Sequence, residues 1–330
     1  MFKLPLQKRS GSFDICPIWV IANQSADWCG DPPSRERIIP MELKHIAARA
    51  GRLSSFLLAD LKMSSGLINK LKWGDAIRVN GTPQRTNYQV LPGDVITVAL
   101  PESEPEYPAQ DGPLTVLYED DHLLAVDKPA GMLIHPSRSR FDGTLANFVQ
   151  GYYRRTGQSC AFHPLTRLDR DTFGIVLLAK DPHVHALLQQ TEVRKTYHAL
   201  TLSGPEREEG TIDAPIARRP LPSLLRFVSP EGKPSVTEYR VLERMESLCK
   251  LELRPITGRT HQLRVHCAHM GFPILGDPQY GSEESRAYSR QLGIPHQLLC
   301  AKSLELCHPI TGEDLRLISE MDVEIRNYKL

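Results

Sequence analysis

The chain has 330 residues, of which 41% are hydrophobic and 24% are charged, and these proportions are typical of a globular protein with one large and one smaller domain. No apolar run reaches the roughly 18–20 residues that cross a bilayer, so the sequence excludes a membrane-spanning protein. The net charge is +1 and the seven cysteines lack CxxC spacing, which favours a reducing cytoplasm over a disulfide framework.

The N-terminal part of the chain divides into a leader and a basic segment. Residues 1–40 contain five prolines and little periodicity, which predicts an irregular leader. Asp14 and Pro17 interrupt the apolar stretch of this leader, so we expect no signal peptide. Residues 41–101 carry eight Lys or Arg against four acids, and this excess predicts a domain that binds a polyanion.

The local pattern of this segment predicts a small α/β domain. Residues 41–72 are predicted to be helical, with Ser64 or Ser65 as the cap of a helix through LINKLKW. The strings AIRVNG and DVITVAL are typical of short strands. Residues 102–113 have the opposite charge, with four acidic residues and no basic one, and they are rich in proline. This composition predicts an acidic linker.

Strands dominate residues 114–330. The predicted strands are LTVLY, HLLAVDK, TFGIVLLAK, KTYHALTL, SVTEYRVLE and LCKLELRPI. One clear helix, PHVHALLQQTEV, can begin at Pro182. Because regular helices do not alternate with these strands, we expect an α+β fold with a mixed, largely antiparallel central sheet and peripheral helices.

The stretch TRLDRDTFG places charges directly before an apolar strand. Asp169 lies between Arg167 and Arg170, and a carboxylate between two arginines stays ionised at neutral pH. Such a group can act as a nucleophile or as an electrostatic stabiliser, but it is a poor general acid. A surface turn with compensating charges explains the same residues, and this stretch alone favours that simpler interpretation.

A second candidate is the helix predicted for residues 260–270, with Thr260 as its cap and Gly271 just past its end. Arg264 lies on a stripe of this helix that is otherwise mostly apolar. A charged side chain there needs an acidic partner, and Asp169 is available.

The sequence predicts neither a metal nor a cofactor. Of the three histidines His261, His266 and His269, only the last two share a helical face, and no carboxylate stands at ligand spacing. Structural or RNA-facing histidines are the alternative interpretation. The sequence contains no GxGxxG, Walker A, GxSxG or kinase signature. This absence argues against most enzymes that use a nucleotide cofactor and against most serine hydrolases.

Tyr197 begins the predicted strand KTYHALTL. A tyrosine at a strand start is most often a half-buried packing residue with a solvated hydroxyl. It can also be an aromatic platform for a base, which contributes ~1–3 kcal/mol per stacked base.

Five strings of the chain, taken together, resemble the RluA-type family of pseudouridine synthases. They are DDHLLAVDKPAGMLIHP, TRLDRDTFG, KTYHAL, PITGRTHQLRVH and GFPILGDPQYG, and they follow one another in the order found in the family. Residues 41–101 resemble, more loosely, the S-four-like RNA-binding domain that often precedes this catalytic domain. The resemblance therefore implies a leader at 1–40, an RNA-binding domain at 41–101, a linker at 102–113 and a catalytic domain at 114–330.

The resemblance implies isomerisation of a uridine in RNA to pseudouridine. In this family the bond from N-1 of uracil to the sugar is broken, the base turns, and the sugar rejoins at carbon-5. By similarity, Asp169 is the catalytic carboxylate, Tyr197 stacks on the uracil and Arg264 pairs with Asp169. The base must leave the stack to reach Asp169, and Arg167 is implied to fill the vacated place.

The implied partner is structured RNA, either ribosomal RNA or transfer RNA. We expect Arg167 and further basic or polar side chains to contact it, namely Arg49, Arg52, Lys62, Lys70, Lys72, Arg259 and His261. No redox step is involved, so no cofactor is implied. We expect a monomeric cytoplasmic protein without membrane association.

The chain departs from the family pattern at two positions beside Asp169. Thr166 stands where the family usually has His, and Phe173 stands where it usually has Ser. Both changes bear on substrate preference and packing. They leave open a catalytically impaired RNA-binding protein of the same fold. A third possibility, a glycosidase that uses Asp169, needs a second carboxylate at a suitable separation, and none stands out.

Overall fold

The computed structural model describes residues 42–100, 106–137, 140–220, 222–223, 225–324 and 327. The leader expected at residues 1–40 lies outside these ranges, as do residues 101–105 of the expected linker.

The N-terminal described residues form a small α/β unit with its own hydrophobic core. Its four-stranded sheet has the order β1-β6-β3-β4, and a short pair joins β2 to β5. The elements are β1 (Glu42–Ile46), β2 (Gly51–Arg52), α1 (Leu53–Ala59), α2 (Ser65–Leu71), β3 (Ile77–Val79), β4 (Thr82–Pro83), β5 (Gln89–Val90) and β6 (Val95–Ala99).

The prediction of helix throughout residues 41–72 is wrong at its start. Glu42–Ile46 is a strand because it pairs antiparallel with Val95–Ala99, a partner some fifty residues away that local pattern does not reveal. The predicted cap of the second helix is confirmed, since the Ser64 hydroxyl accepts a hydrogen bond of 3.2 Å from the Leu67 N–H.

The larger unit contains, among the described residues, a ten-stranded sheet of order β12-β15-β16-β11-β17-β10-β8-β7, with β9 and β18 at its margins. Among these described strands only β10 and β17 pair in parallel, so the expected mixed, largely antiparallel sheet is confirmed. The strands of this sheet are β7 (Thr115–Glu119), β8 (Leu123–Lys128), β9 (His163–Pro164), β10 (Phe173–Ala179), β11 (Val193–Leu202), β12 (Glu209–Asp213), β15 (Val236–Met245), β16 (Leu248–Pro255), β17 (Leu299–Cys307) and β18 (Asp314–Ile318). A separate pair is formed by β13 (Ile216–Arg218) and β14 (Arg226–Val228).

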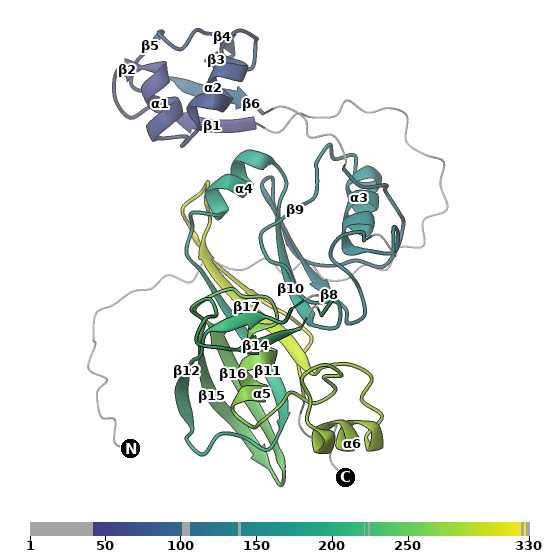
Figure 1. Ribbon diagram of the computed structural model, residues 1–330. Coiled ribbons are helices and arrows are strands. Elements are labelled where there is room, and N and C mark those ends of the chain that lie inside the picture. The colour runs from purple at the N-terminus through teal and green to yellow at the C-terminus, as the bar shows by residue number, and fades with distance from the viewer. Residues whose placement is uncertain are drawn as a thin grey trace, which may run out of the picture. The chain divides into compact units, whose positions relative to one another are not determined.

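The helices of this unit divide between the two faces of the sheet (Figure 1). They are α3 (Leu145–Arg155), α4 (Pro182–Leu188), α5 (Gln262–His269) and α6 (Glu283–Gln291). Helix α3 packs on Leu124 and Val126 of β8, whereas α4 packs on the opposite face. Helix α5 covers Leu251 and Leu253 of β16. The buried side chains of α3 and those of α5 each belong to a hydrophobic cluster on the sheet, here called the α3 cluster and the α5 cluster. Tyr197 packs against both clusters, so the two helices cover the same face of the sheet on either side of this tyrosine.

The cap predicted for α5 is also wrong. The helix begins at Gln262, after His261 in a left-handed conformation with φ of 61°, and the Thr260 hydroxyl makes no cap. The Gln262 side chain instead turns back and accepts hydrogen bonds from the Arg259 N–H and the Thr257 hydroxyl. The end of α5 agrees with the sequence, because Gly271 follows it with φ of +84°.

The described part of the segment predicted as a linker contacts α3. Asn147 accepts a hydrogen bond of 3.0 Å from the Gln110 N–H through its carbonyl, and its side-chain amide donates to the Pro108 carbonyl. Asp111 pairs with Arg154 at 2.9 Å. Residues 108–111 therefore lie against α3.

Gly174, at the start of β10, is the tightest backbone position beside the Asp169 loop. Its φ is +107°, and an added Cβ would lie 2.4 Å from the Ala301 carbonyl oxygen on β17. We expect Gly174→Ala to lower the free energy of unfolding in urea by about 3 kcal/mol or more, because strain and overpacking add.

Gly157→Ala is the matched control. Gly157 also has positive φ, +71°, but among the described atoms an added Cβ there has no neighbour within 4 Å. Conformational strain alone costs about 1–2 kcal/mol. Equal losses at the two positions would contradict the role of the close approach to β17.

Candidate active site

Asp169 lies in the loop between β9 and β10, shortly before β10, all of whose residues are buried. Its carboxylate is 29% exposed, so solvent or a substrate can reach it. The Asp169 carbonyl accepts a hydrogen bond from the Thr172 N–H, which closes a turn and leads the chain into β10. The loop thus presents a charged group at the edge of a rigid strand.

Arg264 of α5 holds this carboxylate, as its place on the helix predicted. Its Nη1 donates to Asp169 Oδ2 at 2.9 Å, although the two residues are 95 positions apart in the sequence. The Arg264 side chain is only 5% exposed. The prediction that Arg264 pairs with Asp169 therefore agrees with the geometry of this structure.

Asp277 is the principal partner of Arg264, and the sequence analysis did not assign it a role. Arg264 donates from Nε and Nη2 to the two oxygens of Asp277, at 2.7 and 2.9 Å. Asp277 is buried, and burial opposes the charge of Arg264, but hydrogen bonds to Asp277 and Asp169 raise the pKa of Arg264 well above its ordinary value. The guanidinium is therefore fixed in orientation as well as in charge.

His261 approaches the other oxygen of Asp169. Its Nε2 lies 3.8 Å from Asp169 Oδ1, and its Nδ1 lies 2.7 Å from the Tyr280 hydroxyl. Burial lowers the pKa of His261, and the attraction of Asp169 opposes that shift. A neutral imidazole at this position borders the open side of the carboxylate. Its location is compatible with the predicted contact to RNA.

Tyr197 lies on the same face of the sheet, where β11 pairs with β16 and β17. The register of β11 against β17 shifts between Thr196 and Tyr197, and Tyr197 stands opposite Ala301, the residue that also pairs with Gly174. Burial raises the pKa of the Tyr197 hydroxyl above its ordinary value, and the nearby charge of Asp169 adds to this. Tyr197 therefore stays neutral, which suits an aromatic surface for a base.

Lys128 is a second residue that sequence reasoning missed. It ends β8, is fully buried, and its Nζ donates to the carbonyls of Pro129, Met132 and Arg170, each at 2.9 Å. Burial lowers the pKa of Lys128 to about 8, while the charges of Asp171 and Asp169 oppose the shift. Because Arg170 follows Asp169, Lys128 ties the loop to the end of β8. The sequence does contain a signal for this role, because Lys128 ends the apolar run LLAVDK directly before the residues PAG.

The other residues predicted to contact RNA differ in their surroundings. Arg167 and Arg259 are exposed in the larger unit, and Arg259 Nε donates to the Pro234 carbonyl at 3.2 Å. Of the contacts predicted in the small unit, Arg49, Arg52, Lys62 and Lys70 are exposed, while Lys72 is half-buried. Arg49 makes a two-pronged ion pair with Asp60, so part of its charge is compensated.

Both ring nitrogens of His266 contact buried protein groups, so the residue has a structural role. Its Nδ1 lies 2.9 Å from the Thr237 hydroxyl and its Nε2 lies 2.9 Å from the Ala214 carbonyl. Within the described ranges, no three His, Cys, Asp or Glu side chains are grouped so as to hold a metal ion. No helix in the part of the chain that the structure describes is long and apolar enough to span a bilayer.

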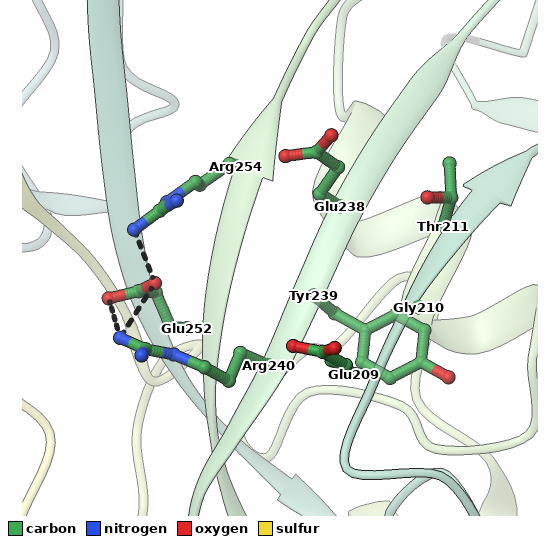
Figure 2. A pocket seen from close by; sticks show the side chains of 8 residues that line it. All are labelled: Glu209, Gly210, Thr211, Glu238, Tyr239, Arg240, Glu252 and Arg254. Carbon is green, nitrogen blue, oxygen red and sulfur yellow. Dashed lines mark hydrogen bonds and ion pairs between the residues drawn. The ribbon is translucent and has the colours of Figure 1, made fainter.

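Figure 2 shows a shallow hollow on the sheet at β12, β15 and β16. The side chains of Glu238, Arg240, Glu252 and Arg254 gather there, and Glu252 forms ion pairs with both arginines. These positions alternate with Tyr239, Leu251 and Leu253, whose side chains enter the α5 cluster. The hollow therefore lies on the face opposite Tyr197 and takes no part in the Asp169 site.

Comparisons with known proteins show which family the chain belongs to. Residues 122–269 match the family model of RNA pseudouridylate synthase. The chain is 34% identical over 282 residues to the uncharacterized RNA pseudouridine synthase YjbO of Bacillus subtilis, covering 84% of this chain and 94% of that protein. It is 35% identical over 303 residues to the ribosomal large subunit pseudouridine synthase D of Xanthomonas campestris, covering 87% of this chain and 88% of that protein.

A solved structure of an RNA pseudouridylate synthase domain is also similar to this chain. The human RNA pseudouridylate synthase domain containing 4 superposes with a TM-score of 0.52 at 27% identity, over 65% of this chain and 91% of that chain. The sequence relatives are matched over nearly their whole length and exceed 30% identity. This chain belongs to the RluA-type family of RNA pseudouridine synthases, enzymes that isomerise uridine in RNA to pseudouridine.

Proposed function

We propose that Asp169 is the catalytic carboxylate of this isomerisation. The observation that carries the proposal is the chain of charged contacts from Asp169 to Arg264 at 2.9 Å and from Arg264 to the buried Asp277 at 2.7 Å. It supplies an ionised, oriented and solvent-accessible carboxylate. Such a group can attack the anomeric carbon of the ribose or stabilise positive charge there, as carboxylates do in glycosidases.

The neighbouring side chains fit the remaining steps. Tyr197, which packs beside the α3 and α5 clusters, would stack on the uracil while it turns. Arg167 is exposed two residues before Asp169 and would occupy the place that the flipped nucleotide leaves in the RNA. Every step is a transfer of the glycosidic bond or a proton, so the proposal requires no redox cofactor.

The proposed substrate is ribosomal RNA of the large subunit, with transfer RNA as the alternative target. Relatives named as ribosomal large subunit pseudouridine synthases support this choice. The proposal further takes the protein to be a cytoplasmic monomer, with residues 41–101 as an RNA-binding domain and residues 114–330 as the catalytic domain. Mapping pseudouridine in total RNA from cells with and without the gene tests the target directly.

The competing proposal is a protein of the same fold that binds RNA without modifying it. The departures Thr166 and Phe173 motivate it, but both side chains are buried and serve the packing of the loop. Thr166 accepts a hydrogen bond from the Leu177 N–H, and Phe173 packs edge-on against His296. Pseudouridine formed on bulk RNA by the purified protein would decide against this alternative.

The small basic unit should contribute affinity and not chemistry. We expect replacement of Arg52, Lys62 and Lys70 by Gln to weaken RNA binding and to reduce the slope of log affinity against log salt by roughly one per lost phosphate contact. All three side chains are exposed, so folding should be unaffected. Measuring RNA binding over a salt series checks this, and an unchanged slope would argue against the RNA-binding role of this unit.

A further inference from the structure

The small unit exposes one large aromatic side chain. Trp73 follows α2 directly and is 72% exposed, which is more than any other tryptophan, tyrosine or phenylalanine of this unit in the described ranges. Of its neighbours along the chain, Lys70, Gly74 and Asp75 are also exposed, Lys72 is half-buried and Leu71 is buried. An exposed indole offers a flat aromatic face and an N–H donor to a binding partner.

Two cations accompany the ring. The Lys72 ammonium lies 5.2 Å from the ring centroid and the Arg85 guanidinium carbon lies 5.0 Å from it. Arg85 comes from the segment after β4, and it is held beside the ring because its Nη1 donates to the Lys72 carbonyl at 2.8 Å. The sequence analysis named Lys72 as an RNA contact, but it gave no role to Trp73 or Arg85.

The charge around Trp73 is one-sided. Residues 61–93 contain five Lys or Arg and a single acid, Asp75. The acids of the unit outside this stretch include Asp60, which is paired with Arg49, and Asp94, which accepts hydrogen bonds from Asn80 and from the Leu91 N–H. The surface that carries Trp73 is therefore suited to a polyanion.

We propose that Trp73 is a stacking platform for an unpaired base of the RNA substrate, with Lys72 and Arg85 beside it for the phosphates. Stacking on an aromatic side chain is stronger than a solvent-exposed cation–π contact, so a base can displace a flexible cation from the ring. The displaced ammonium or guanidinium can then turn to a phosphate. The proposal rests on the RNA-modifying function and adds a binding site in the small unit.

A single flat ring surrounded by charged residues fits a nucleobase better than a lipid surface. Membrane-bound surfaces insert several apolar side chains together, which the residues flanking Trp73 do not provide. A base needs only one accessible ring face and nearby positive charge.

The test measures binding of the full chain to an RNA hairpin with a single-stranded loop and to a fully paired RNA of equal length. We expect Trp73→Leu to weaken hairpin binding by about 5- to 150-fold, the range for loss of one stacked base, with little change for the paired RNA. Trp73→Phe should retain most of the affinity because it keeps a flat ring. Leu91→Ala, at an apolar side chain of the same unit that is 57% exposed, should bind as wild type. Equal binding by the Leu and Phe variants would overturn the proposal.

Fluorescence provides a second, direct readout. Replacing Trp19 and Trp28 by Phe leaves Trp73 as the sole tryptophan of the chain. Stacking predicts quenching of its emission by the hairpin and not by the paired RNA. Quenching by vesicles of anionic lipid, without an effect of the hairpin, would refute the proposal.

Activity separates this proposal from the proposed function. At saturating RNA, Trp73→Leu should form pseudouridine at the wild-type rate, with only the KM raised. Absence of pseudouridine formation in the wild-type chain would refute the proposed function, whereas normal activity with unchanged KM in Trp73→Leu would refute the stacking platform.

Discussion

Asp169→Asn should abolish pseudouridine formation, with a loss of more than about 10³-fold, while the protein still folds and binds RNA. The amide has nearly the shape of the carboxylate and can still accept a hydrogen bond from Arg264, whose Nη1 lies 2.9 Å from Asp169 Oδ2. It cannot act as a nucleophile or supply negative charge at the ribose. The measurement is pseudouridine formation on bulk RNA, with RNA binding followed in parallel.

Asp171→Asn is the matched control for this experiment. Asp171 lies in the same loop, but its carboxylate accepts hydrogen bonds from both Nε and Nη2 of Arg170. The Asp171 side chain is only 16% exposed and lies 2.7 Å from the Arg170 guanidinium. The control variant should retain near wild-type activity. An inactive Asp171→Asn beside an active Asp169→Asn would mean that the wrong carboxylate has been chosen.

Arg264→Ala should have the largest effect on stability and should also reduce activity. It removes the guanidinium and both of its hydrogen bonds from the buried carboxylate of Asp277, which keeps the backbone N–H bonds of Gln279 and Tyr280, and breaking a buried ion pair costs about 3–5 kcal/mol in the free energy of unfolding. It also frees Asp169 to move, and a displacement of about 1 Å at the reacting group lowers the rate by about 10²-fold or more. Urea unfolding and pseudouridine formation measure the two effects separately.

Arg264→Lys distinguishes charge from geometry. A lysine keeps the positive charge, but its ammonium cannot donate two hydrogen bonds to Asp277 and a third to Asp169 from one plane. Arg264→Lys should therefore restore stability and activity only in part. Arg240→Ala is the control for loss of an arginine ion pair, since Arg240 binds Glu252 on the opposite face and is 55% exposed. That change should cost at most about 1 kcal/mol. Wild-type activity in folded Arg264→Ala would disprove the positioning role.

Several features of the site could be predicted from the sequence because they depend on local pattern. An Asp between arginines before an apolar strand marked the loop of Asp169, and a charged residue on a mostly apolar helical stripe required an acid, which placed Arg264 beside it. The strand period likewise identified β7, β8, β10, β11, β15 and β16 of the larger unit, and with them the α+β class, but not β17, which lies between β10 and β11 in the sheet.

Other features followed only from tertiary contacts. The strand Glu42–Ile46 was missed because its pairing partner is β6, and the start of α5 was missed because His261 adopts a left-handed conformation. In both cases a long-range or side-chain interaction outweighs the local propensity that sequence reasoning uses.

The sequence by itself determined that the carboxylate of Asp169 lies just before the buried strand β10 and that Arg264 pairs with it. Only the tertiary structure decided how that arginine is held. Asp277 reaches Arg264 from a loop 13 residues further on, and Lys128 ties the carbonyl of Arg170 to β8 across 42 positions. The physical reason is that buried charges must find all their partners within the fold, and no spacing rule along the chain encodes which residues the fold will bring to them.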